Sequence, residues 1–483
     1  MNKLRYILPY WKLITLVVLF VVIRIVTLQH DALPSWDAAV YIGMGKYLFS
    51  HGSIGTWEAL RPVGLPIMLG AFWKIGIDPY VAGQVISLII SAGLLVLVYF
   101  FTERIRPHSG TIAATVLAAT AVFFTNSALP ITDIISTFFA VLALFLIYKA
   151  QTTRQYFIAG IVIAIACMFR FPQGLMLVIA MVAIAIKIFY EPTLLKFKKG
   201  KLGERVVTAI ERMFSVGGGF FLIVVPFLIG NYYFYNNAFL PFIQGAAIIK
   251  LYPSLYQKGP LFYVLEVVKA DPLFVLGLLP IGLLWKKEYR TKGIFIVITA
   301  IVFIAGYFTY QVHKESRYMV AFLPYIAMLT ACGVTYILEY VKLPQLLFFG
   351  LFAIAGFMVT AGLLFHTTTP DNKAFHDFNK YFNKTEGAHI LSATPFPFVY
   401  ANVFLEHDLY SDWNNAYYEY NTLKNQIDYI ALDSCNLEQG CADNTHCTDD
   451  KEVLLATLRK NDMEVFSATT PAQCQLSIYK ITH

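Results

Sequence analysis

Charged residues are scarce in this chain. Asp, Glu, Lys and Arg make up 14% of its 483 residues, whereas hydrophobic residues make up 58%. A soluble globular protein carries roughly a quarter of charged residues. The hydrophobic residues form runs near the length that crosses a bilayer, and these runs recur over residues 1–365. Since a backbone in lipid must satisfy its hydrogen bonds internally, the sequence predicts an all-α polytopic membrane protein and excludes a soluble fold.

A cleavage site of small residues is also absent after the first apolar run, Ile14 to Leu28. The basic residues Lys3, Arg5 and Lys12 precede this run, as they do in a signal peptide. Because further apolar runs follow, we interpret the segment as an uncleaved first transmembrane helix.

We predict about eleven transmembrane helices. Their expected bounds are roughly 13–29, 79–101, 111–127, 131–149, 156–171, 174–190, 213–235, 272–285, 293–310, 318–338 and 345–365. The stretch 63–77 is also apolar, but it is short and contains Pro66 and Lys74. We therefore interpret 63–77 as a re-entrant or interfacial segment.

Basic residues set the expected orientation. The net charge is +7, and Lys and Arg gather in alternate loops, above all in the expected loop 191–212. Because cytoplasmic loops are rich in Lys and Arg, eleven spans place the N-terminus in the cytoplasm and the C-terminus on the other side. We expect an integral protein of the plasma membrane, or of the endoplasmic reticulum in a eukaryote. The same distribution explains the positive charge without a nucleic-acid partner.

Cysteine is rare, and its distribution is uneven. Two of the six cysteines, Cys167 and Cys332, lie in expected spans, where they suit packing. The other four lie in residues 366–483 and predict two disulfides in an oxidising compartment: Cys435, Cys441, Cys447 and Cys474. Zinc binding is an alternative, although the usual C-x2-C spacing is absent. The sequence leaves the pairing open.

Residues 366–483 differ from the rest because they are acidic as a whole and contain no long apolar run. Short β-like runs occur at His389–Ala393, Tyr429–Leu432 and Leu476–Ile481, with a helical run at Glu452–Leu458. This pattern predicts a small extracytoplasmic α/β domain that follows a membrane domain of residues 1–365.

Polar residues gather at the expected outer ends of helices rather than at mid-depth, and the expected outer loop 30–78 holds several of them. Within this loop, Trp36, Val40 and Met44 recur at helical spacing, which predicts an amphipathic helix lying on the membrane. Asp37 falls in its first turn, where the helix dipole favours a carboxylate, so a capping role is the alternative to a catalytic one.

Several of these outer segments resemble a known family. The acidic loop helix is followed by Arg61-Pro-Val-Gly-Leu-Pro66, Asp133 opens the expected fourth span, and His313-Lys-Glu-Ser-Arg317 opens a late one. Together with Arg24 in the first span, this order resembles the GT-C glycosyltransferases. More narrowly, it resembles the dolichyl-phosphate-mannose–protein mannosyltransferase family and its prokaryotic relatives, which include the lipid A aminoarabinose transferases.

The resemblance implies transfer of a sugar from a polyprenyl- or dolichyl-phosphate donor to a hydroxyl of a protein, glycan or lipid, on the extracytoplasmic side and with inversion. It implies that Asp37 is the general base and Asp133 a second carboxylate. Cations suit the leaving phosphate, and the candidates are His313, Lys314, Arg317, Arg61 and Arg170. Glu58 and Tyr41 are candidates for contact with acceptor or sugar.

Motifs of metal-dependent relatives, D-x-D, D-x-E and W-W-D, are absent from residues 1–365. We therefore expect no required cofactor, with a divalent cation held by Asp37, Glu58 and Asp133 as the alternative. Two other functions remain open at this stage. A flippase or transporter of the same lipid predicts charged residues at mid-depth, for which Arg24 is the candidate. A non-catalytic membrane subunit predicts no effect of Asp37 on activity.

Overall fold

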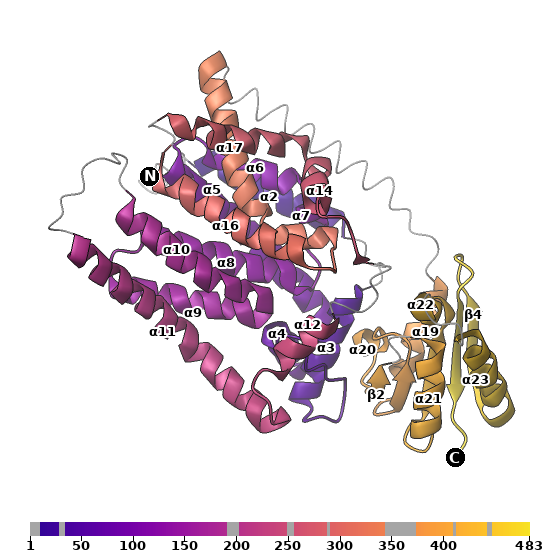
Figure 1. Cartoon of the computed structure of the whole chain (residues 1–483). Coiled ribbons are helices and arrows are strands. Elements are labelled where there is room, and N and C mark those ends of the chain that lie inside the picture. The colour runs from indigo at the N-terminus through magenta and orange to yellow at the C-terminus, as the bar shows by residue number, and fades with distance from the viewer. Residues whose placement is uncertain are drawn as a thin grey trace.

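The computed structural model describes residues 10–28, 34–190, 202–248, 256–286, 290–342, 373–408, 412–441 and 447–483. Up to residue 342 the described chain is helical, and after residue 373 it forms a small domain with a five-stranded sheet (Figure 1). The predicted fold class, a helical membrane protein with a small C-terminal α/β unit, is confirmed. The predicted boundary at residue 365 lies outside the described residues and stays a prediction.

The helical part consists of long helices joined by short turns. Its α-helices are α2 (Trp11–Val26), α3 (Trp36–Phe49), α4 (Gly64–Lys74), α5 (Pro79–Ile105), α6 (Gly110–Ala119), α7 (Ala121–Asn126), α8 (Thr132–Lys149), α9 (Thr153–Phe169), α10 (Met176–Phe189), α11 (Leu202–Tyr235), α12 (Leu240–Ile248), α14 (Phe262–Ala270), α15 (Leu278–Gly282), α16 (Lys292–Tyr310) and α17 (Leu323–Val341). Short 3-10 helices are η2 (Phe171–Leu175), η4 (Pro272–Gly277), η5 (Leu283–Trp285) and η7 (Ser316–Ala321).

Six described helices are long and apolar enough to cross a membrane, or seven if one bent pair is a single span. The chain is therefore an integral membrane protein, while the number of spans stays a prediction. The expected span 345–365 lies outside the described residues. The expected spans at 111–127 and 156–171 correspond to helices shorter than 18 residues, and the former is interrupted between α6 and α7 by the extended backbone of Thr120.

Two parts of the expected topology differ from the structure. The expected loop 191–212 is helical from Leu202 onward, because Ala209 continues the buried face of α11. The expected span 272–285 is the second arm of a pair with α14, bent by 114°. The bend falls at Asp271, whose carboxylate accepts a hydrogen bond from the amide of Leu273 at 2.9 Å.

The first helix of the expected outer loop 30–78, α3, is buried within the protein. α3 begins at Ser35, whose hydroxyl accepts a hydrogen bond from the Ala38 amide at 3.3 Å. The expected amphipathic character of this helix was wrong, because every residue from Ala38 to Lys46 is buried. Its position on the membrane stays a prediction. α3 packs against α4 and against α20 (Pro397–Tyr400) of the C-terminal domain. α4 has 11 residues, about 16 Å at the helical rise, so the expectation that 63–77 is too short to span agrees with the structure.

The C-terminal domain has the strand order β2-β1-β3-β5-β4. Its strands are β1 (His389–Ser392), β2 (Phe404–Asp408), β3 (Tyr429–Asp433), β4 (Met463–Thr469) and β5 (Gln475–Lys480). β1 pairs in parallel with β2 and β3, whereas β5 is antiparallel to β3 and β4. The helices are α19 (Lys373–Lys380), η8 (Tyr381–Lys384), α20 (Pro397–Tyr400), α21 (Trp413–Leu423), α22 (Ser434–Gly440) and α23 (Cys447–Asn461).

Sequence periodicity predicted three of these strands and missed β2 and β4. β4 was missed because its burial does not alternate cleanly. The two expected disulfides are present and join Cys435 to Cys474 and Cys441 to Cys447. Cys167 and Cys332 are free and buried, as expected for packing residues.

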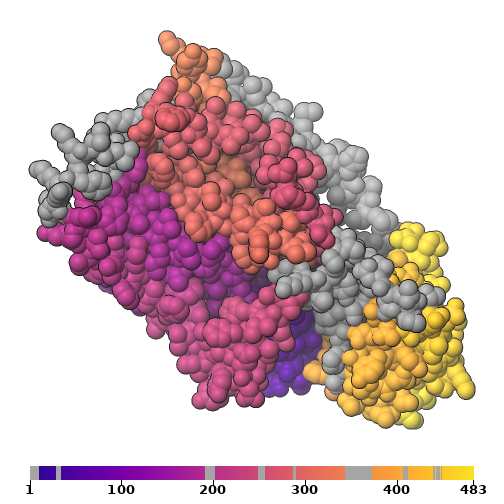
Figure 2. All heavy atoms as spheres, in the orientation of Figure 1, coloured from indigo at the N-terminus to yellow at the C-terminus, as the bar shows by residue number. Residues whose placement is uncertain are grey.

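The sheet domain contacts the helical part through α3 and the segment after it (Figure 2). The ammonium of Lys46, 4% exposed, donates hydrogen bonds to the carbonyls of Phe398 at 2.7 Å and Ala401 at 2.8 Å. Gly55 continues the contact, because its backbone pairs with Val403 and Leu405 beside β2. These contacts bring the C-terminal domain next to the end of the bundle that carries Asp37.

Candidate functional site

Asp37 lies between two arginines that are far from each other in the sequence. Arg61 Nη1 donates to Asp37 Oδ1 at 2.6 Å, and Arg317 Nη1 donates to Asp37 Oδ2. Arg61 also donates through Nε to Glu58 Oε2 at 2.6 Å and lies over the ring of Tyr41, with 5.3 Å to its centroid. The N-cap of α3 is Ser35, and both oxygens of the Asp37 carboxylate accept from guanidinium groups instead.

Glu315 forms the next part of the network. Its carboxylate accepts from Arg317 Nη2 at 3.1 Å and from the Tyr318 hydroxyl at 3.0 Å, and it contacts His313 Nε2 at 2.6 Å. The His313 ring stacks on Tyr256 with centroids 3.8 Å apart. Glu315 and Tyr318 were not among the predicted site residues, although Glu315 lies within the H-K-E-x-R stretch that pointed to its neighbours.

Asp133 and Arg170 form a second ion pair beside the first network. Asp133 lies in the first turn of α8 and is 4% exposed. The guanidinium of Arg170, at the end of α9, lies 4.6 Å from the centroid of the Tyr318 ring. Because the Tyr318 hydroxyl donates to Glu315, this tyrosine joins the two groups of charges.

The helix ends explain why these side chains meet. Asp37 and Asp133 lie at helix N-termini, where the helix dipole favours a carboxylate. Arg170 follows the last residue of α9, and residues 311–322 connect α16 to α17. All of these helix ends lie at one end of the bundle. The site is thus assembled at the ends of helices rather than in the middle of them.

Electrostatics keep both central carboxylates ionised. Burial alone raises the pKa of Asp37, but the charges of Arg317 and Arg61 outweigh burial and hold the pKa well below its usual range. Burial likewise opposes ionisation of Glu315, yet His313 and Arg317 lower the pKa of Glu315 to about 2. A carboxylate paired in this way is a weak base until its cation partners are moved.

Not every predicted residue joins the network. Lys314, 7% exposed, donates to the carbonyl of Lys258 at 3.1 Å rather than to a carboxylate of the network. Arg24 donates to Ser127 Oγ and to the carbonyl of Thr125, each at 3.2 Å, and so connects α2 to the end of α7. These contacts give Arg24 a helix-packing role within the structure.

Within the described residues, one group of three side chains has a spacing suited to a metal ion: Asp433, Cys435 and Cys474. The two cysteines are joined in a disulfide, so their sulfurs are not thiolate ligands. At the candidate site, Asp37, Glu58 and Asp133 each have a guanidinium partner. A cation bound there would have to compete with Arg61, Arg317 and Arg170.

The fold is that of membrane glycosyltransferases. The chain is similar to the archaeal oligosaccharyltransferase AglB from Archaeoglobus fulgidus, in complex with an inhibitory peptide and a dolichol-phosphate. The TM-score is 0.62 and the identity 11%, over 99% of this chain and 75% of that chain. It is also similar to ArnT from Cupriavidus metallidurans bound to undecaprenyl phosphate, with a TM-score of 0.60 and 10% identity, over 97% of this chain and 98% of that chain.

A family model agrees with the structural likeness. The model of the dolichyl-phosphate-mannose-protein mannosyltransferases matches residues 61–209, which include Arg61, Asp133 and Arg170. Asp37 and the stretch 313–317 lie outside the matched residues. No curated protein sequence matches the chain. The predicted resemblance to the GT-C glycosyltransferases is confirmed by the fold and by this family match.

Proposed function

We propose that this protein is a glycosyltransferase that moves a sugar from a polyprenyl or dolichyl phosphate to a hydroxyl of a protein, glycan or lipid, on the extracytoplasmic side. The contact of Asp37 with both Arg61 and Arg317 carries the proposal. Such a transfer needs a carboxylate to remove a proton and cations to hold a phosphate, and this network supplies both. The dolichol-phosphate and undecaprenyl phosphate in the AglB and ArnT structures support the donor class.

The proposed reaction is a single displacement. The acceptor oxygen forms a bond to the anomeric carbon while the bond from that carbon to the phosphate oxygen breaks. The carrier phosphate leaves with the bonding electrons, and Asp37 takes the proton of the attacking hydroxyl. Attack and departure on opposite faces of the sugar invert the anomeric centre.

Donor binding and base activation are coupled in this proposal. Arg61 and Arg317 bind the Asp37 carboxylate, but a guanidinium also matches two phosphate oxygens and binds them strongly. When the donor phosphate takes hydrogen bonds from these arginines, the Asp37 oxygens are released and the carboxylate becomes more basic. Asp37 therefore becomes an effective base only after the donor phosphate has bound.

The neighbouring residues have supporting roles in this reaction. Asp133, paired with Arg170, orients acceptor or sugar, and Arg170, whose guanidinium lies over the Tyr318 ring, adds positive charge beside the network. Glu58 fixes Arg61, while Glu315 fixes Arg317 and His313. The Tyr41 ring supports the Arg61 guanidinium. Tyr41 is 5% exposed, so its contact with the sugar would require the residues that cover it to move. Lys314 would reach a phosphate only after leaving the Lys258 carbonyl.

The proposal requires no metal, because a hydroxyl needs less activation than an amide nitrogen. A structure of the Archaeoglobus fulgidus oligosaccharyltransferase is a complex with Zn and sulfate, and a divalent cation between Asp37, Glu58 and Asp133 is the alternative for this chain. Treatment with a chelator distinguishes the two. Unchanged transfer supports the metal-free reaction, whereas loss that added Mg²⁺ or Mn²⁺ restores would assign a cation.

Purified protein in lipid, supplied with a panel of radiolabelled polyprenyl-phosphate sugars and a mixed acceptor fraction, tests the function. Wild type is expected to transfer sugar, and Asp37→Asn is expected to lose transfer while it still binds donor. Asp78→Asn is the matched control, because Asp78 caps α5 outside the network and asparagine caps a helix equally well. Full activity of Asp37→Asn would remove this residue as the base. Movement of the lipid across the bilayer without transfer would favour a flippase.

A further inference from the structure

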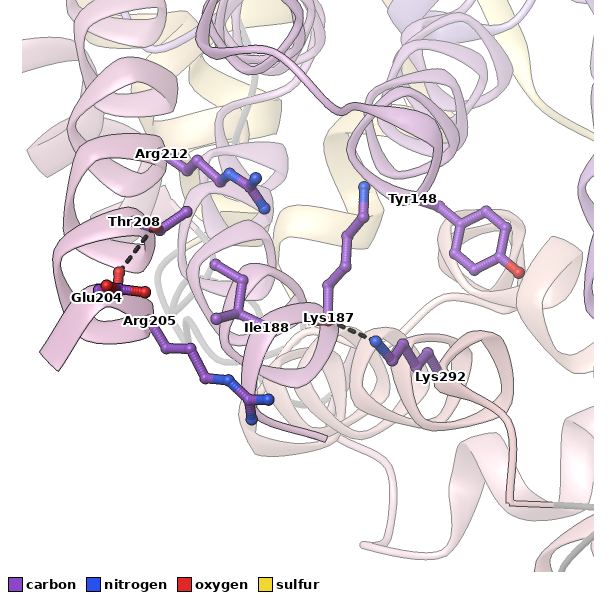
Figure 3. A pocket seen from close by; sticks show the side chains of 8 residues that line it. All are labelled: Tyr148, Lys187, Ile188, Glu204, Arg205, Thr208, Arg212 and Lys292. Carbon is purple, nitrogen blue, oxygen red and sulfur yellow. Dashed lines mark hydrogen bonds between the residues drawn. The ribbon is translucent and has the colours of Figure 1, made fainter. Parts of the chain in front are cut away.

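A second cluster of charges lies at the opposite end of the helices from Asp37. A pocket of about 700 Å³ opens there between α8, α10, α11 and the start of α16. Its lining includes the cations Lys187, Arg205, Arg212 and Lys292, with Glu204 as the one carboxylate among the residues that line it. Figure 3 shows the two arginines on α11 and the two lysines on α10 and α16 lining the pocket.

The cations are held close together by the packing of the helices. Lys187 donates to the carbonyl of Ile147 at 2.9 Å, and Lys292 donates to the carbonyl of Lys187 at 2.8 Å. The charges of Lys187 and Arg212 lie 5.4 and 5.2 Å from the centroid of the same Tyr156 ring. Arg212 and Lys292 both repel the ammonium of Lys187. An anion in the pocket relieves this repulsion.

The depth of the pocket fits the headgroup layer. α8 has 18 residues, with Asp133 of the candidate site near its start and Tyr148 of the pocket near its end, and α16 runs 19 residues in the other direction. At 1.5 Å per residue each helix is about 27 Å long, close to the ~30 Å hydrocarbon core of a bilayer. When Asp37 and Asp133 lie at one membrane surface, the pocket therefore lies at the other.

The charge distribution places this surface in the cytoplasm by the positive-inside rule, and the cytoplasmic leaflet carries anionic lipids. We propose that the pocket binds the phosphate of an anionic phospholipid headgroup. Guanidinium and ammonium groups suit phosphate oxygens, and the Arg212 and Lys292 side chains approach from two different helices. The lipid would hold α11 against α10 and α16 independently of sugar transfer.

Native mass spectrometry of the full-length protein tests the proposal. Delipidated protein is supplied with phosphatidylglycerol or with phosphatidylcholine of the same acyl chains, and bound lipid is counted. Wild type is expected to retain phosphatidylglycerol preferentially. Arg212→Gln with Lys292→Gln is expected to weaken this retention about thirtyfold, since each cation near an anionic headgroup contributes about fivefold. Equal retention of the two lipids by wild type would overturn the proposal.

Arg154→Gln is the matched control, because Arg154 is exposed at the start of α9, at the same end of the bundle, and does not line the pocket. It is expected to retain phosphatidylglycerol like wild type, and a loss equal to that of the double variant would refute a specific site. Should the double variant not fold, Lys292→Gln alone, which alters an exposed side chain, is expected to weaken retention about fivefold.

Inorganic phosphate and glycerol phosphate form the last arm of the experiment. If the pocket selects a lipid, millimolar concentrations of either ion leave bound phosphatidylglycerol in place, because the acyl chains add to binding. Release of the lipid by free phosphate would assign the pocket to a soluble phosphate compound and overturn the lipid assignment.

Discussion

Replacement of Arg317 tests the coupling between donor phosphate and base. Arg317 donates to Asp37 and to Glu315, and its side chain is 27% exposed. A hydrogen bond between charged groups contributes roughly 1.5–3 kcal/mol. Loss of a two-pronged phosphate contact in Arg317→Gln therefore corresponds to about 3 kcal/mol, or donor binding weaker by on the order of 100-fold. Asp37 and Glu315, left with fewer cation partners, add repulsion against the phosphate.

Arg317→Lys restores the charge but not the two-pronged geometry, so we expect donor binding roughly tenfold weaker than in wild type. The assay is equilibrium binding of a polyprenyl-phosphate sugar to protein in nanodiscs, combined with the transfer rate at saturating donor. Lys269→Gln, an exposed cation on α14 that pairs with Glu266, is the control and is expected to behave like wild type. Donor affinity of Arg317→Gln within threefold of wild type would refute the assignment of Arg317 to the phosphate.

Three further predictions follow from the same contacts. Glu315 has its pKa lowered to about 2, so its ion pairs are expected to stabilise the fold above about pH 4.5 and to be lost as the pH falls towards 2. Thermal unfolding of wild type is expected to show this loss of stability in acid, and Glu315→Gln is expected to show less of it. Asp133→Asn is expected to lower kcat by roughly 10- to 100-fold with donor affinity nearly unchanged, since Asp133 pairs with Arg170 rather than with Arg317. An equal loss of donor affinity would instead assign Asp133 a role in binding the donor phosphate. Burial lowers the pKa of Lys46 to about 8, so the contact of the C-terminal domain with α3 is expected to strengthen as the pH rises from 8 towards 10. Lys46→Met leaves two carbonyls without their hydrogen-bond donor and is expected to speed limited proteolysis between the domains.

Local patterns in the sequence predicted the elements that local physics controls. Long apolar runs predicted spans that the structure shows as α5, α8, α16 and α17, since helices in lipid depend on length and hydropathy. Short β-like runs predicted β1, β3 and β5, because the pattern of a strand also lies in neighbouring residues. The pattern failed where tertiary contacts override it, as at α3, which both α4 and α20 cover, so that no exposed face remains.

The sequence predicted which residue types form the candidate site and that they lie at one end of the bundle, but not which of these side chains pair with each other. Order and spacing of motifs pointed to Asp37, Arg61, Asp133, Arg170 and Arg317. Nothing in the sequence showed that Arg317 would reach Asp37 across 280 positions. Glu315 was passed over because a carboxylate beside three basic residues has no evident role until its partners are known.

The sequence by itself determined that this chain is a helical membrane protein with a cysteine-containing α/β unit and polar motifs at helix ends, because hydropathy and periodicity act over neighbouring residues. Only the tertiary structure decided which guanidinium meets which carboxylate, which cysteines join, and where basic residues from α10, α11 and α16 form a pocket. Those outcomes depend on how the helices pack, and contacts between helices are set by the shapes and charges of surfaces that are distant in the chain.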